Sequence, residues 1–238
     1  MILLALDTCD ARGSLALLRD DDVIYVAAHD APLDYSSWVL PAAESAVAAT
    51  HLKMPEIEIF AVAAGPGSFT GIRVGLTTVK AWNEVYGGRI AAVSRLEAIA
   101  ELAAAQTDYI AAFVDAQREQ VFGGLYRREA ENLTLVEEEL VVAPEGFLAF
   151  VEEHAATGSV SWISMDPQKI TALPSWSRCA QKGARVQRCE SVLAPILGQI
   201  GRKRALHGQT TNALSLDAEY VRRSDAEIFW KGRAARGA

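Results

Sequence analysis

Residues 65–75 read GPGSFTGIRVG, and this glycine-rich stretch largely decides how the rest of the chain is interpreted. It follows the apolar run 59–64, which predicts a buried strand, and it leads into a helical pattern. Gly67, Gly71 and Gly75 recur four residues apart, so in a helix they lie on one face. Because that face carries no side chains, another group can approach the backbone closely.

The close approach at this glycine face has three interpretations. An anion could bind at the helix N-terminus, where Ser68 or Thr70 could cap free N–H groups. The spacing fits neither a Walker loop, which needs a lysine after its second glycine, nor the dinucleotide fingerprint. The glycines could instead serve a tight turn of the chain's own sheet, or they could dock against another protein.

Composition limits the class of protein. The chain has 238 residues, 50% hydrophobic and 22% charged, which is typical of a globular protein of one or two domains. Its net charge of -7 argues against a free-standing nucleic-acid binder, so we expect any contact with nucleic acid to be indirect. Three widely spaced cysteines and the lack of a long apolar run predict a cytoplasmic protein without a membrane partner.

The order strand, aspartate, turn, strand, strand, helix occurs twice along the chain. The first predicted strand ends at Asp7, and the strand that opens the second half ends at Asp115. Such a repeat predicts an α/β fold of two similar lobes, residues 1–106 and 107–238. We expect the second lobe to be reduced and allow its tail to pack back onto the first.

The two repeated aspartates are the candidates for chemistry. Ligands of open α/β sheets collect at the carboxyl ends of strands, where a carboxylate can hold Mg-nucleotide or act as a base. Thr8, beside Asp7, is a second candidate for contact with a phosphate. The alternative is that Asp7 and Asp115 only cap the turns that follow them. No histidine pair has metal-ligand spacing and no serine elbow occurs, so we expect no metal and no catalytic residue.

Four segments of the chain resemble the TsaB (YeaZ) family of tRNA threonylcarbamoyl-adenosine biosynthesis. Residues 65–75 resemble the family's signature, and residues 4–8 (LALDT) resemble its first strand and turn. Residues 114–122 (VDAQREQVF) resemble the start of its second lobe, and residues 220–223 (YVRR) its closing segment. The resemblance covers nearly the whole length of the chain.

The resemblance implies an actin-like, sugar-kinase-like fold of two duplicated lobes. It also implies a subunit without catalysis of its own, which pairs with its paralogue TsaD and with the ATPase TsaE. The complex would transfer threonylcarbamoyl to the adenosine next to the anticodon of tRNAs that read ANN codons. Such a subunit would need no cofactor of its own, would meet ATP or ADP only in the complex, and would form a homodimer when alone.

The same resemblance places the partner surface on the first two helices. Tyr35 and Val39 stand where a metal-binding histidine pair would have to be, so we expect no metal there. If the glycine face docks a partner, Gly71→Leu would abolish pairing without unfolding the chain. The residues expected at the interface are Trp38, Val39, Pro41, Gly67, Phe69, Gly71, Arg73, Gly75 and Leu76.

The alternative function is an autonomous ATP-dependent kinase of small molecules with the same fold. Asp7 would then contact phosphate or metal, and Asp115 would act as the base.

Overall fold

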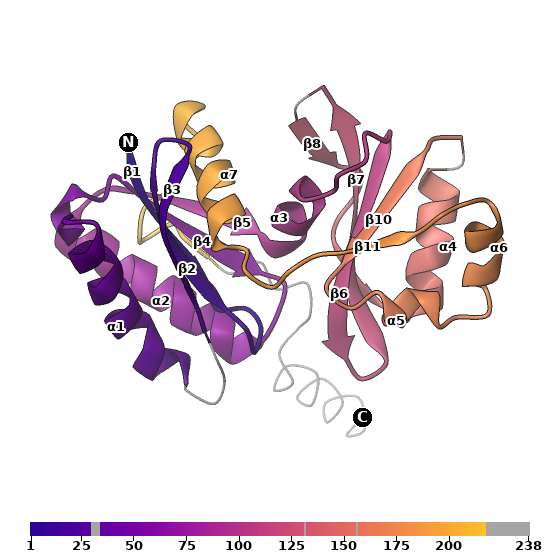
Figure 1. Ribbon diagram of the computed structural model, residues 1–238, viewed down its shortest axis with the longest axis horizontal. Helices are drawn as coiled ribbons and strands as arrows, with labels where there is room; N and C mark the ends of the chain where they lie inside the picture. The colour runs from indigo at the N-terminus through magenta and orange to yellow at the C-terminus, as the bar shows by residue number, and fades with distance from the viewer. Residues whose placement is uncertain (30–33, 131, 156, 218–238) are drawn as a thin grey trace, which may run out of the picture.

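Two β-sheets, each with helices packed on it, form two lobes that lie side by side (Figure 1). This computed structural model describes residues 1–29, 34–130, 132–155 and 157–217. No helix among these residues combines the length and the apolar character that crossing a membrane would take.

The first sheet has five strands in the order β3-β2-β1-β4-β5. Its strands are β1 (Ile2–Asp7), β2 (Ser14–Arg19), β3 (Asp22–Ala28), β4 (Ile59–Gly65) and β5 (Arg89–Ser94). Strand β1 pairs antiparallel with β2 and parallel with β4. The central strands are buried along almost their whole length, as expected where helices cover both faces of a sheet.

Helices α1 (Tyr35–Ala49) and α2 (Phe69–Tyr86) cover one face of this sheet, separated in sequence by the short 3₁₀ helix η1 (Met54–Glu56). Ser68 caps α2, because its Oγ accepts a hydrogen bond from the Gly71 N–H at 3.4 Å. The helix ends at Gly87, whose φ of 80° suits glycine. Of the two caps that the sequence offered, Ser68 and Thr70, the structure has Ser68.

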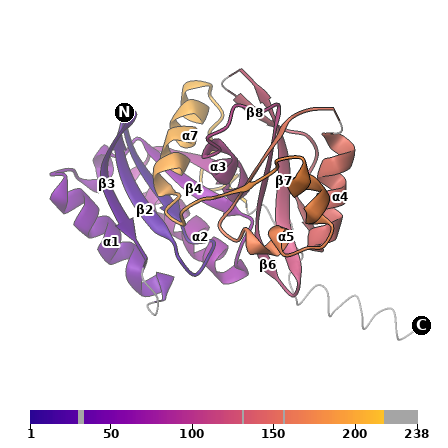
Figure 2. The same ribbon diagram turned by 45° about the vertical axis from the view of Figure 1, so that its right-hand side comes forward.

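The second sheet has the order β11-β10-β6-β7-β8, with β9 also paired to β7. Its strands are β6 (Tyr109–Gln117), β7 (Gln120–Glu129), β8 (Asn132–Leu135), β9 (Leu140–Val142), β10 (Val160–Ser164) and β11 (Val186–Arg188). Helices α4 (Pro144–His154), α5 (Gln168–Thr171) and α6 (Trp176–Gln181) lie on its outer side (Figures 1 and 2). Both sheets thus begin with an antiparallel hairpin and a third strand, and the predicted α/β fold with a repeated opening is confirmed.

Helix α3 (Arg95–Glu101) lies between the two sheets and packs against strands of both. One cluster of buried apolar residues runs from the first sheet across Leu96 and Ile99 to Ile110 and Ile163 of the second. A separate cluster, around Phe147, fills the outer side of the second sheet. The two lobes therefore share a hydrophobic core at their junction.

The predicted division at residues 106 and 107 falls in the connection between α3 and β6. Helix α7 (Ala194–Leu206), however, packs on the first sheet, against β1, β2, β4 and β5. Gly201 makes this close approach possible, since a Cβ there would lie 2.7 Å from the Cβ of Ala61 in β4. The C-terminal part of the chain thus returns to the first lobe at α7, whereas the segment 220–223 lies outside the described residues.

Candidate functional site

The glycine face of α2 lies against the turn after β1 in the same molecule. A Cβ on Gly71 would overlap the Thr8 carbonyl oxygen, and a Cβ on Gly67 would overlap that of Cys9. A Cβ on Gly75 would lie 2.5 Å from Thr8 Oγ1, and that hydroxyl donates to the Gly71 carbonyl at 2.7 Å. The prediction that Gly67, Gly71 and Gly75 dock a partner is therefore wrong, because the chain's own backbone occupies that face.

Two further residues of the expected interface also lie inside the molecule. The side chains of Val39 and Leu76 are only 1% and 6% exposed and belong to the core beneath α1 and α2. Trp38 is partly buried, with its ring 5.2 Å from that of His29. The two helices turn the glycines, Val39 and Leu76 toward the sheet, so only their opposite side can meet a partner.

That opposite side, the outer helix face, consists of Leu40, Pro41, Phe69 and Arg73. Leu40 is 54% exposed, and Pro41 and Arg73 are exposed as well. The Arg73 guanidinium carbon lies 3.7 Å from the centre of the partly exposed Phe69 ring. Pro41, Phe69 and Arg73 were expected at the interface from the sequence, whereas Leu40 was not.

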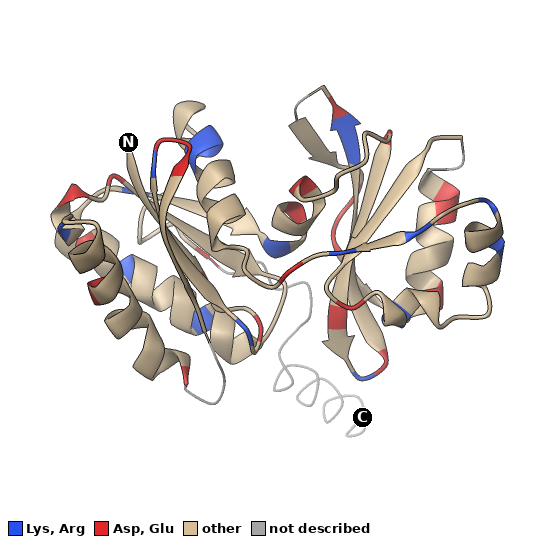
Figure 3. Ribbon diagram, in the orientation of Figure 1, with Lys and Arg blue, Asp and Glu red and all other residues tan. Residues whose placement is uncertain are grey.

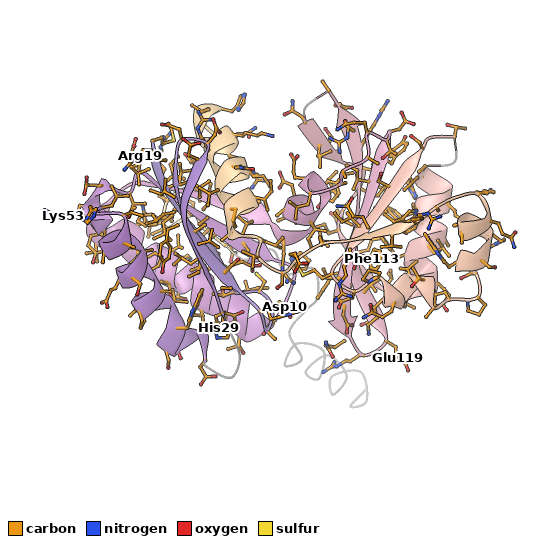
Figure 4. All side chains as sticks on the ribbon, viewed as in Figure 1. Asp10, Arg19, His29, Lys53, Phe113 and Glu119 are labelled. Carbon is orange, nitrogen blue, oxygen red and sulfur yellow. The ribbon has the colours of Figure 1, made fainter. Side chains whose placement is uncertain are left out.

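Near the junction of the lobes, Arg95 lies between two carboxylates of the turn after β1. Its Nε is 3.4 Å from Asp7 Oδ2, and its Nη2 donates to Asp10 Oδ2 at 2.9 Å. Asp7 and Arg95 are 0% and 2% exposed, whereas Asp10 lies at the side of the first lobe that faces the second (Figure 4). Arg95 also approaches Met165 Sδ of the second lobe at 3.4 Å.

The charges of this cluster stabilise one another. Burial alone would lower the pKa of Arg95, but Asp7 and Asp10 outweigh burial and raise it. Burial likewise opposes ionisation of Asp10, but the charge and hydrogen bond of Arg95 outweigh it and lower the pKa of Asp10. The cluster is therefore an internal ion triad of Asp7, Asp10 and Arg95 (the Arg95 triad).

The other contacts of Asp7 are those of a turn cap. Its Oδ1 accepts a hydrogen bond from the Cys9 N–H at 2.8 Å, as an Asx turn requires. Burial, followed by the nearby Asp7 charge, raises the pKa of the Cys9 thiol well above its usual value. The thiol stays protonated and lies 3.5 Å from the Ala63 carbonyl oxygen. Cys9 is thus a small residue buried in the core.

Asp115 has an analogous environment in the second lobe. Its Oδ1 accepts from the Gln117 N–H at 2.8 Å, and its Oδ2 lies 2.9 Å from Lys169 Nζ. Both strand-end aspartates therefore cap a turn, and each is paired with a cation of the same chain. Among the residues that the structure describes, no group of three or more His, Cys, Asp or Glu is arranged to hold a metal ion.

Polar contacts around α3 hold the two lobes in place. Ser94 caps α3 by accepting from the Leu96 N–H at 3.1 Å, and its hydroxyl also donates to Glu139. Tyr126 donates to the same Glu139 oxygen at 2.8 Å. Gln187 of β11 donates from Nε2 to the Leu102 carbonyl at 2.9 Å. Sequence patterns gave no signal for the contacts of Glu139 and Gln187, because their partners lie far apart along the chain.

These features define a class: a two-lobed α/β protein of the actin-like, sugar-kinase-like fold whose strand-end carboxylates are engaged by internal cations. A Pseudomonas aeruginosa protein with similarity to peptidase YEAZ superposes with a TM-score of 0.74 at 22% identity, over 93% of this chain and 99% of that one. The ROK hexokinase of Thermus thermophilus gives a TM-score of 0.51 at 13% identity, over 84% of this chain and 97% of that one. At these identities the likeness shows the fold alone.

Sequence similarity identifies the family. The family model described as "TsaD: tRNA N6-adenosine threonylcarbamoyltransferase" matches residues 29–194. The Bacillus subtilis protein TsaB is 35% identical over 53% of this chain and 56% of its own length, so this match spans little more than half of that relative. Escherichia coli TsaB is 26% identical over 97% of both chains. The chain therefore belongs to the TsaD family that the model describes, and within it to the TsaB (YeaZ) proteins.

Proposed function

We propose that the chain is the scaffold subunit of a tRNA threonylcarbamoyltransferase complex and has no catalytic chemistry of its own. It pairs with TsaD and TsaE, and the complex modifies the adenosine next to the anticodon of tRNAs that read ANN codons. ATP or ADP binds only at the level of the complex, and the subunit alone forms a homodimer. Membership of the TsaB proteins supports the pathway.

The state of the two strand-end aspartates is the observation that carries the proposal. A kinase of this fold needs a carboxylate free to coordinate Mg²⁺ or to accept a proton from the substrate. Asp7 is fully buried against Arg95, and Asp115 is paired with Lys169. Mg²⁺ at Asp7 would have to displace a buried guanidinium, which leaves a second buried charge without a partner. Docking without chemistry explains these contacts better than the alternative of an autonomous kinase.

The junction of the lobes supports the same function. Many two-lobed enzymes close around their substrate, and this closure requires lobes that move against each other. Here α3 packs on strands of both sheets and continues the core between them. The hydrogen bond from Ser94 to Glu139 adds a polar contact across the same junction, and Tyr126 of the second lobe donates to the same Glu139 oxygen. A shared core opposes closure and suits a rigid subunit.

The outer helix face is the surface we assign to the partner, in place of the buried glycine face. Leu40 and Phe69 supply apolar area, and Arg73 stacks over Phe69. Aromatic, aliphatic and arginine side chains of this kind often contribute about 2 kcal/mol or more each when they are buried at the centre of an interface. The same face can pair two copies of the chain when TsaD is absent.

The test compares two exposed leucines in the full chain. Leu40→Asp should abolish the pairing with TsaD in size-exclusion chromatography and should leave the isolated chain monomeric, because it places a charge at the centre of the contact. Leu135→Asp, on β8 of the second lobe, is the matched control and should pair as the wild type does. Both variants should melt within a few degrees of the wild type, since surface substitutions change stability by about 0.5 kcal/mol or less. Normal pairing of Leu40→Asp would overturn the assigned surface.

A further inference from the structure

One segment of the second lobe is strongly basic although the chain as a whole is acidic. Residues 167–189 contain five Lys or Arg and no Asp or Glu, whereas the chain has a net charge of -7. The segment comprises α5, α6 and β11, and β11 is the edge strand of the second sheet. Figure 3 shows lysines and arginines following one another from α6 along the connection into β11.

Four of these five cations are exposed and have no acidic partner in the part of the chain that the structure describes. Arg178, Lys182, Arg185 and Arg188 are exposed, and none of them forms an ion pair with any carboxylate of the described residues. The fifth cation, Lys169, is the one already paired with Asp115. The two arginines at the ends of α7's basic run likewise have partners: Arg202 pairs with Asp21 and Arg204 with Glu97. The four cations of this segment are thus available to a ligand.

The local geometry places these cations on the outer side of the second lobe. Arg178 and Lys182 are four residues apart, so they lie on the same side of α6 and its last turn. In β11, Val186 packs into the outer core cluster, whereas Gln187 reaches inward to the end of α3. Side chains alternate along a strand, so Arg188 lies on the same outer side as Val186. The charges therefore follow a line from α6 to the sheet edge.

We propose that this line of cations, the basic strip of Arg178, Lys182, Arg185 and Arg188, binds the phosphate backbone of tRNA directly. Unpaired Lys and Arg side chains are the groups that neutralise nucleic-acid phosphates, and they do so without reading sequence. A row of single charges can contact several phosphates of one strand. The acidic remainder of the surface repels RNA, so it directs the RNA to this strip. The identity of the RNA as tRNA rests on the proposed function, and the direct contact goes beyond the indirect role expected from net charge.

The test measures the salt dependence of binding between the full chain and an unmodified tRNA transcript, by fluorescence anisotropy. Each lost phosphate contact should lower the slope of log K against log salt by about 0.7–0.9. The double variant Arg185→Ala/Arg188→Ala should therefore have a slope that is less steep by about 1.5. When salt rises fourfold, this variant should lose about 8-fold less affinity than the wild type loses. The control Arg19→Ala/Lys53→Ala removes two exposed cations from the first lobe, far from the strip (Figure 4), and should leave the slope unchanged.

Three results would overturn the direct contact. The first is an absence of binding by the wild-type chain at low salt, and the second is an equal change of slope in the control. The third is an unchanged RNA slope together with lost pairing with TsaD, which would assign the strip to an acidic protein surface instead. Pairing with TsaD is measured separately and should persist in Arg185→Ala/Arg188→Ala. Failure of the scaffold proposal would appear as an absence of pairing between the wild-type chain and TsaD, independently of the salt slopes.

Discussion

Replacing Arg95 by methionine should destabilise the chain strongly at neutral pH. Methionine preserves most of the apolar length of the side chain but removes the charge between Asp7 and Asp10. Asp7 is 0% exposed, so its carboxylate would lose its cation without gaining access to water. Removing one partner of a buried ion pair costs about 3–5 kcal/mol, because the remaining charge stays buried and unpaired.

This cost corresponds to a large thermal shift. A change of 1 kcal/mol moves the melting temperature of a chain of this size by about 2–4 °C, so Arg95→Met should melt about 6–20 °C below the wild type. Part of this cost depends on pH, because Arg95 lowers the pKa of Asp10 in the wild type. The lowered pKa of Asp10 contributes stability above the unfolded pKa, and this is lost as pH falls through the folded value.

Circular dichroism melts at pH 8 and pH 3 measure both effects, because the stability that Asp10 contributes is lost only below its unfolded pKa. The control Arg178→Met removes an exposed cation that has no ion-pair partner among the described residues, and it should change stability by about 0.5 kcal/mol or less. Asp7→Asn combined with Arg95→Met should recover part of the loss, since neither buried charge then remains. A melting temperature of Arg95→Met equal to that of the wild type at pH 8 would refute this role of Arg95. So would a difference in melting temperature between variant and wild type that is the same at both pH values.

Two further predictions concern packing and titration. Gly71→Ala should lower the free energy of unfolding in urea by about 1–3 kcal/mol or more, because its Cβ would overlap the Thr8 carbonyl oxygen. The control Gly146→Ala, at an exposed position of α4, should be neutral or stabilising by up to about 1 kcal/mol. Equal effects of the two variants would contradict the packing of the glycine face. The pKa of His154 is raised, first by its hydrogen bond to the Phe150 carbonyl and then by Glu137, so NMR should find it above 6.5 and lower in Glu137→Gln. Its stabilising contribution is present below the unfolded pKa and is lost as pH rises through the folded one, and an unperturbed value would refute this environment.

Local patterns predicted much of the fold. The apolar run 59–64 became β4, Ser68 is the cap that α2 uses, and the strands predicted to end at Asp7 and Asp115 open the two sheets, although β6 runs on to Gln117. These features depend on residues close together in sequence, where capping and hydrophobic pattern are informative. The pattern of residues 133–142 alone predicts one strand, but the structure has two, β8 and β9, because different parts of β7 pair with each.

Contacts between distant segments were not predictable in the same way. Periodicity shows that three glycines share a helix face but does not show whether that face meets the chain's own Thr8 or another protein. Arg95 is 88 residues from Asp7, and no spacing rule relates a cation at the start of one helix to a carboxylate at the end of a strand. Among the alternatives for Asp7, the turn cap is the one that the structure favours, and Arg95 explains how its charge is tolerated in the core.

The most direct test of the scaffold proposal is threonylcarbamoyl transfer to tRNA, reconstituted with TsaD and TsaE and measured for two variants of this chain. Asp115→Asn removes the base that an autonomous kinase would need, and Leu40→Asp places a charge on the outer helix face. We predict that Asp115→Asn supports modification at nearly the wild-type rate and that Leu40→Asp does not. Loss of modification with Asp115→Asn, in a variant that still folds and pairs with TsaD, would show that this chain contributes chemistry and would contradict the account.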